Sequence, residues 1–248
     1  MWPYPKVVAH RGGGILAPEN TLAAMQCGLA HGFHAVEFDV MLSKDGIPVV
    51  LHDPVFGRTV AGTGRVSDRT AAQLALLDAG SWFGAAYAGE PVPSYAEVFR
   101  FCMASKIWMN VEIKPDAGCA ELTGRVVAET TRKLFAGETS DDRLRPLFSS
   151  FSCEALLAAK SAAPEIPRGY LVERVAPDWR DRLDEIDAIA LHTNQKYLAL
   201  EQARGVKEAG FGLFCYTVND PIRARELLAW GVDAFCTDRI DLIGPDFC

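Results

Sequence analysis

The chain has 248 residues, 49% of them hydrophobic and 23% charged, with a formal net charge of −7. A single domain of this length buries enough surface to fold without a disulfide or a metal, so any metal here would serve chemistry. Acidic and basic residues are interspersed, which argues against a nucleic-acid or membrane-surface footprint. An anionic substrate would therefore need local positive charge.

The cysteines and the N-terminal residues predict the cellular compartment of the protein. The seven cysteines are odd in number, scattered and mostly embedded in apolar runs, which predicts reduced, buried and inert thiols. The N-terminal residues lack the apolar core of a signal peptide, and no stretch approaches about 18 uninterrupted apolar residues. We therefore expect a cytoplasmic protein.

Short apolar runs predict eight strands, which alternate with helical patterns. Helix start signals precede residues 19–30 at Pro18, residues 95–104 at Ser94 and residues 221–230 at Asp220. Strict alternation predicts parallel strands, and eight such strands close a TIM (β/α)8 barrel. The predicted strands are residues 6–10, 35–42, 107–114, 147–150, 168–172, 188–193, 212–218 and 234–238.

One connection, residues 42–93, is too long for a single crossover. Its apolar run 48–52 is interpreted as a return or extension of the second strand near the barrel mouth. The remainder, at about residues 54–93, is interpreted as an inserted cap over that mouth. The predicted fold is α/β, with one TIM-barrel domain over residues 1–248 and a small cap inserted after the second strand.

Acidic side chains stand on two of the predicted strands. Glu37 and Asp39 are two apart, so both point to one face of their strand. An amphipathic strand with one wet face is the plain alternative, but a parallel barrel strand has no wet face, so its carboxylates must pair or bind a cation. Glu112 and Lys114 repeat the spacing, and an ion pair of Lys114 with Glu112 or Asp39 is the alternative there. Three oxygen ligands, Glu37, Asp39 and Glu112, suit Mg²⁺ or Ca²⁺ better than Zn²⁺.

Two histidines end apolar runs and precede charged residues. A single histidine at a strand end is more often structural, but His10 and His52 would converge on the C-terminal face of a barrel, where active sites lie. Their near-neutral pKa would let one act as base and the other as acid. Arg11 offers a planar fork for a phosphate oxygen, and Lys114 a compact charge near the metal. For His192, a further contact near the mouth and a hydrogen-bonded core position are both open.

Short motifs occur in order along nearly the whole chain. They are His10-Arg11-Gly12, Pro18-Glu19-Asn20-Thr21, Glu37-Phe38-Asp39-Val40, Leu51-His52-Asp53, Glu112-Ile113-Lys114, Ser149-Ser150-Phe151, Tyr216-Thr217-Val218-Asn219 and Thr237-Asp238. Together they resemble the glycerophosphodiester phosphodiesterase family, in its bacterial cytoplasmic type.

The resemblance implies a TIM barrel with an insertion after the second strand. It also implies metal-dependent hydrolysis of glycerophosphodiesters to sn-glycerol 3-phosphate and an alcohol. The aromatic residue before Thr217 is commonly Trp in that family and is Tyr216 here, so contacts to the glycerol or alcohol moiety are expected to differ. The implied site has Glu37, Asp39 and Glu112 as ligands of Mg²⁺ or Ca²⁺, His10 and His52 as acid and base, and Arg11, Lys114 and Tyr216 as substrate-binding residues.

Two other functions remain open from the sequence. A lipid phosphodiesterase of the sphingomyelinase or phospholipase D type would need an apolar rim, for which Trp82 and Phe83 are candidates, although packing of the cap on the barrel explains them as well. A barrel that binds phosphodiesters without turnover is the other, since a fold alone does not establish function. The expected partner is a small glycerophosphodiester, without nucleic acid or stable membrane association, and self-association into a homo-oligomer stays open.

Overall fold

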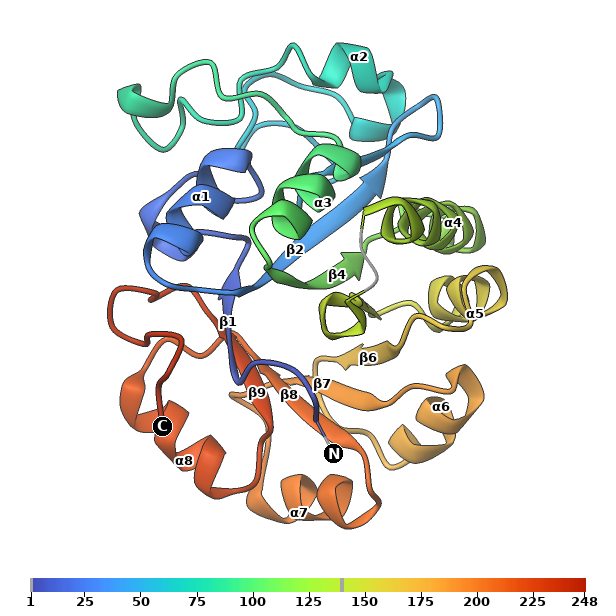
Figure 1. The fold of residues 1–248 in the computed structure, drawn as a ribbon. Coiled ribbons are helices and arrows are strands. Elements are labelled where there is room, and N and C mark those ends of the chain that lie inside the picture. The colour runs from blue at the N-terminus through green and yellow to red at the C-terminus, as the bar shows by residue number, and fades with distance from the viewer. Residues whose placement is uncertain (1, 139–140) are drawn as a thin grey trace.

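The computed structural model describes residues 2–138 and 141–248, in which eight parallel strands close into a TIM barrel (Figure 1). Around the barrel the strands run in the order β1-β9-β8-β7-β6-β5-β4-β2, and pairing of β1 with β2 closes it. All eight predicted strands are confirmed, with small shifts at their ends. They are β1 (Val7–His10), β2 (Ala35–Leu42), β4 (Trp108–Ile113), β5 (Leu147–Ser150), β6 (Arg168–Val172), β7 (Ala190–Asn194), β8 (Gly212–Tyr216) and β9 (Ala234–Thr237).

Helices surround the barrel (Figure 1), and several of them begin at a side-chain cap. Ser94 caps α3 in a capping box with Glu97, and Asp220 caps α8 with Pro221 in the first turn, as predicted. The helices are α1 (Leu22–Ala30), α3 (Tyr95–Ala104), α4 (Ala120–Glu138), α5 (Cys153–Ala162), α6 (Trp179–Ile186), α7 (Leu200–Glu208) and α8 (Pro221–Ala229).

Helix α1 begins later than predicted, at Leu22 and not at residue 19. Asn20 has a φ of 62°, which a right-handed helix excludes, and the side chain of Thr21 accepts the first capping bond from the backbone N–H of Ala24. The prediction took Pro18 as the opening residue of the helix. Glu19 and Asn20 instead lie in the loop after β1, close to the residues at the barrel mouth.

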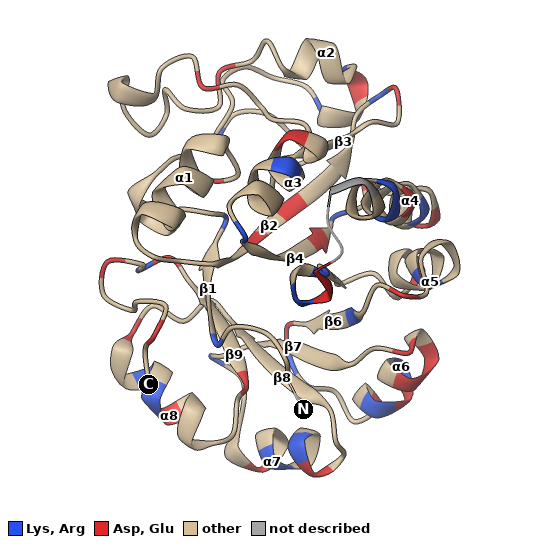
Figure 2. Ribbon diagram, in the orientation of Figure 1, with Lys and Arg blue, Asp and Glu red and all other residues tan. Residues whose placement is uncertain are grey.

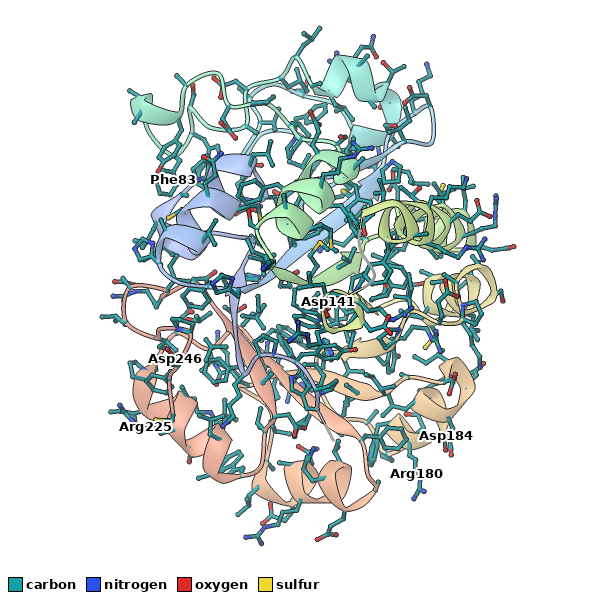
Figure 3. The ribbon with its side chains drawn as sticks, in the orientation of Figure 1. Phe83, Asp141, Arg180, Asp184, Arg225 and Asp246 are labelled. Carbon is teal, nitrogen blue, oxygen red and sulfur yellow. The ribbon has the colours of Figure 1, made fainter. Side chains whose placement is uncertain are left out.

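The amino-terminal end of the barrel is filled by aromatic side chains. Tyr4 stacks on Trp108 with ring centroids 4.4 Å apart, and Trp2 packs against Trp108 at 6.2 Å. Side chains also fill the barrel centre in Figure 3, whereas charged ones such as Arg180 and Asp184 on α6 point outward. A barrel of this size has a packed core and not a pore, so the open face is the C-terminal one.

His192 lies in this core and not at the mouth. Its ring stacks on Phe214 at 4.6 Å, and Trp2 lies 6.3 Å away. The side chain is fully buried, and neither ring nitrogen makes a hydrogen bond to any of the described residues. Burial lowers the pKa of His192 to about 3, so the imidazole is neutral. The core position expected for this residue is therefore confirmed, whereas the hydrogen bond expected there and the alternative contact near the mouth were wrong.

The long connection after β2 contains a return strand and a small core of its own. β3 (Pro48–Val50) pairs antiparallel with the end of β2, as expected, and the short helix α2 (Ala71–Leu74) follows in the segment that leads to α3. Trp82 is 43% exposed and contacts Phe83, which contacts Tyr87, so these rings pack on one another within the insertion. The small core comprises Met41, Val49, Leu51, Val60, Val66, Leu74, Ala79 and Val92.

The prediction for the cysteines holds in part. All seven thiols are free, as predicted, but Cys248 is exposed. Burial is confirmed only for Cys102, Cys215 and Cys236, because Cys27, Cys119 and Cys153 are partly exposed. Within the part of the chain that the structure describes, no helix has the length and apolarity needed to cross a membrane.

Alanine substitutions at two helical glycines are expected to change the free energy of unfolding in opposite directions. A Cβ on Gly124 of α4 would lie 2.0 Å from the carbonyl oxygen of Ala155 in α5, whereas a Cβ on Gly205 of α7 would meet nothing within 4 Å. We expect Gly124→Ala to destabilise the protein by about 1 to 3 kcal/mol through overpacking. We expect Gly205→Ala to stabilise it by up to about 1 kcal/mol through helix propensity. Urea unfolding measures both, and a Gly124→Ala protein as stable as wild type would contradict this view of the α4–α5 contact.

Candidate active site

Three carboxylates meet at the C-terminal mouth of the barrel. Glu37 and Asp39 on β2 and Glu112 on β4 face inward, and Asp39 is paired in register with Glu112; red marks both strands in Figure 2. One ligand oxygen from each of the three lies within 4.8 Å of the others. The structure therefore brings together the three predicted metal ligands, on neighbouring strands whose register fixes their separation.

Asp39 is the carboxylate with the most positive surroundings. It accepts a hydrogen bond of 2.8 Å from Asn20 Nδ2, and Arg11 Nε and Lys114 Nζ lie 3.5 and 3.6 Å from its oxygens. Burial acts to raise the pKa of Asp39, but the charges of Arg11 and Lys114 outweigh it and lower the pKa to about 2. Asp39 is therefore ionised.

Glu37 and Glu112 have the opposite shift. Burial raises the pKa of Glu37 well above its ordinary value, and the charges of Asp39 and Glu112 raise it further. Burial and the charge of Asp39 raise the pKa of Glu112 to about 7, although Lys114 Nζ lies 3.3 Å from Glu112 Oε1. The ion pairs of Lys114 with Glu112 and Asp39, which the sequence left open as an alternative to a metal site, thus exist. They do not compensate the negative charge of all three carboxylates.

The donor set fits a divalent cation. Three inward carboxylates supply oxygen ligands, which hard cations such as Mg²⁺ and Ca²⁺ prefer, and no histidine or cysteine belongs to the cluster. A dication would also offset the burial and the like charge that raise the pKa of Glu37 and Glu112. These residues are therefore suited to hold a metal ion.

Each of the two mouth histidines is held by an aspartate. His10 Nδ1 lies 2.5 Å from Asp238 Oδ1, and His52 Nδ1 lies 2.6 Å from Asp53 Oδ1. Because a carboxylate only accepts, Nδ1 is the protonated nitrogen in each ring, and Nε2 of the neutral imidazole can take a proton. Burial lowers the pKa of His52, Arg11 and Lys114 add to this, and Asp39 opposes it, which favours the neutral base.

Arg11 is oriented by several groups but retains donor capacity. Its Nη1 donates to Glu19 Oε1 at 2.6 Å, and its backbone N–H donates to Glu37 Oε2 at 3.3 Å. Among the described residues Arg11 Nε makes no hydrogen bond, but it is buried 3.5 Å from Asp39 Oδ2 and so faces that carboxylate. Arg11 also lines the cavity at the mouth, where a phosphate oxygen would accept hydrogen bonds from its guanidinium.

A cavity of about 180 Å³ joins these groups. It is lined by both histidines, by Arg11 and Lys114, and by Glu37 and Glu112, with Phe151 and Tyr216 on one side. The two rings meet edge to face at 5.9 Å, and the Tyr216 hydroxyl donates to the carbonyl of Val172 at 2.9 Å. Its lining combines charged groups with aromatic rings, which suits a small molecule that has an anionic part and an organic part.

Sequence reasoning missed the residues that hold the site groups in place. Glu19 and Asn20 bind Arg11 and Asp39, and Asp53 and Asp238 bind the two histidines. Asn219 in turn donates from Nδ2 to Asp238 at 2.8 Å. All of them stood in the short motifs, but their roles depend on partners distant in sequence.

A closed parallel barrel whose C-terminal mouth gathers carboxylates, imidazoles and two cations defines a TIM-barrel enzyme. Residues 10–242 match the model of the glycerophosphoryl diester phosphodiesterase family. The chain therefore belongs to that family and is a phosphoric diester hydrolase.

The chain also aligns with individual relatives over most of their lengths. The chain is 34% identical to a glycerophosphodiester phosphodiesterase from Caldanaerobacter subterraneus subsp. tengcongensis, over 94% of this chain and 93% of that protein. It is 32% identical to one from Bacillus subtilis, over 95% and 84%. Among solved structures, a phosphodiesterase from Oleispira antarctica in complex with the product sn-glycerol-3-phosphate is 38% identical, with a TM-score of 0.88 over 95% of this chain and 93% of that one.

The charge imbalance predicts an unusual pH dependence of stability in metal-free protein. The folded-state pKa of Glu112 is raised to about 7 from 4.5, so its contribution to stability is complete below pH 4.5 and is lost as pH rises through 7. A group that binds more protons in the folded state contributes a slope of up to about 1.4 kcal/mol per pH unit over that range. We expect Glu112→Gln to flatten the fall in unfolding free energy measured in chelator. An equal fall in wild type and variant would contradict the assignment.

Proposed function

We propose that the chain hydrolyses glycerophosphodiesters to sn-glycerol 3-phosphate and an alcohol, in a reaction that depends on a divalent cation and uses His10 and His52 as acid and base. The observation that carries the proposal is one cavity lined by two aspartate-held imidazoles, two cations and part of a carboxylate cluster. The Oleispira antarctica relative, in complex with sn-glycerol-3-phosphate, supports the same product here.

Glu37, Asp39 and Glu112 would hold the cation, either Mg²⁺ or Ca²⁺. When bound, it would supply positive charge that offsets the negative charge developing on the phosphoryl oxygens. Arg11 and Lys114 bind the non-esterified phosphate oxygens and fix the diester for attack. Phe151 and Tyr216 contact the organic part of the substrate.

The histidines move the protons. One neutral imidazole accepts the proton of the attacking oxygen at Nε2, while the other, in its protonated form, donates to the departing alkoxide. Asp53 and Asp238 keep each ring in the tautomer that presents Nε2 and stabilise its positive charge. The aspartates therefore act on orientation and charge, and the imidazoles on the reacting atoms.

The proposal extends to the domain organisation of the enzyme and to its cellular compartment. We take residues 1–248 as one domain with its insertion at about 54–93, because the small insertion core includes residues of β2 and β3. We place the protein in the cytoplasm, a reducing compartment in which seven free thiols are stable.

Product release from chelator-treated protein tests this function. We expect sn-glycerol 3-phosphate from glycerophosphocholine or glycerophosphoethanolamine when Mg²⁺ or Ca²⁺ is returned, and little without it. Sphingomyelin serves as the lipid substrate for the alternative activity. Turnover of sphingomyelin alone would favour the lipid-cleaving enzyme, and no turnover of any substrate with either metal would favour a binding protein.

Single histidine substitutions test the acid and base. His10→Ala and His52→Ala should each lower kcat by about 10² to 10⁴, which corresponds to roughly 3 to 5 kcal/mol. His34 precedes β2 at the opposite end of the barrel and is exposed, so His34→Ala is the matched control and should leave kcat unchanged. A loss below tenfold in both mouth variants would contradict the assignment.

A further inference from the structure

Arg58 of the insertion reaches the active site from outside the barrel. It lies in a tight loop between Val55 and Arg65, which form an antiparallel bridge, and the following Thr59 and Val60 are buried. Its guanidinium donates from Nε to Asp53 Oδ2 at 2.6 Å and from Nη1 and Nη2 to the two oxygens of Glu19 at 2.7 Å each. All three nitrogens are thus bound to carboxylates.

The two carboxylates that Arg58 joins are those that hold two active-site groups. Asp53 uses its other oxygen, Oδ1, to bind His52 Nδ1 at 2.6 Å. Glu19 binds Arg11 Nη1 at 2.6 Å. Arg58 is therefore one contact away from the imidazole that transfers a proton and one contact away from the guanidinium that faces the phosphate.

We propose that Arg58 is a positioning residue, which sets His52 through Asp53 and Arg11 through Glu19 and so makes the insertion part of the catalytic apparatus. The inference rests on the proposed function. A planar guanidinium can serve both carboxylates at once because its donors form a rigid fork, which the single ammonium of lysine does not reproduce.

The arrangement differs from an ordinary surface ion pair. Exposed pairs contribute little because solvent screens them and the side chains are mobile. Here the Arg58 side chain is 45% exposed, but Glu19 is 13% and Asp53 24% exposed, and their remaining contacts point into the site. Loss of Arg58 would leave both carboxylates free to turn away from the groups they orient, and misplacement of about 1 Å can cost about 100-fold in rate.

Arg65 provides a matched control within the same insertion. Its side chain is 43% exposed and also binds a barrel carboxylate, that of Asp116, to which Arg65 Nε donates at 3.3 Å. The other hydrogen bonds of Asp116 come from Ser67 and from the backbone of Ala117. Substitution of Arg65 thus removes one tie between the insertion and the barrel without touching the carboxylates that orient His52 and Arg11.

Steady-state kinetics of Arg58→Met, Arg58→Lys and Arg65→Met, on glycerophosphocholine with saturating metal, test the inference. We expect both Arg58 variants to lower kcat and raise KM, with a loss in kcat/KM of about 10- to 100-fold. Arg65→Met should stay within about threefold of wild type. Equal losses in the Arg58 and Arg65 variants, or wild-type kinetics in Arg58→Met, would overturn the inference.

Chemical rescue separates positioning from a merely structural role. Guanidinium ion at millimolar concentration should restore part of the activity of Arg58→Ala and none of that of Arg65→Ala, with thermal unfolding as a check that both variants are folded. Absence of rescue in folded Arg58→Ala would count against positioning. If wild type cleaves the substrate and only the Arg58 effects fail, the inference is wrong and the proposed function stands; if wild type cleaves no glycerophosphodiester, both fall together.

Discussion

The active site depends on the confinement of three carboxylates at the mouth of a barrel, with the cations Arg11 and Lys114 beside them. Arg11 and Lys114 hold Asp39 in its ionised form, but burial and like charge raise the pKa of Glu37 and Glu112. The free protein pays for this arrangement in stability, and a dication would relieve it. The like charge that destabilises this cluster would therefore favour a dication there.

The register of strands β2 and β4 brings the three carboxylates together. Asp39 lies opposite Glu112 on the next strand, and the alternation of side chains along β2 places Glu37 on the same inward face. A shift of one residue in either strand would turn its carboxylates toward the helices. The hydrophobic outer faces of the strands, packed on the helices, hold that register and so hold the site.

Several acidic side chains and Asn20 orient the groups that are proposed to act on substrate. Asp53 and Asp238 select the tautomers of the two histidines, while Glu19 and Asn20 position Arg11 and Asp39. These residues come from loops that follow strands, and one of their links, Arg58, comes from the insertion. The late start of α1 is needed for these contacts, because it leaves Glu19 and Asn20 in a loop from which their side chains can reach the mouth.

Much of the molecule was predictable from local chemistry. Apolar runs predicted every barrel strand, Ser94 and Asp220 predicted helix starts, and the two-residue spacing of Glu37 and Asp39 predicted a shared face. The start of α1 was not predictable in this way, because Asn20 adopts a left-handed conformation while its side chain binds Asp39, which lies 19 residues away in sequence. The aromatic surroundings of His192 were not predictable either, because they depend on Phe214 and on Trp2 from the far end of the chain.

Calorimetric titration of Ca²⁺ into chelator-treated protein near pH 7, in two buffers of different ionisation enthalpy, tests the central claim most directly. Carboxylates must lose their protons to bind metal, so heats that depend on the buffer report proton release. The account predicts one ion per chain, release of protons from Glu37 and Glu112, and weaker binding by Glu37→Gln. Binding without proton release, or equal binding by Glu37→Gln, would contradict it.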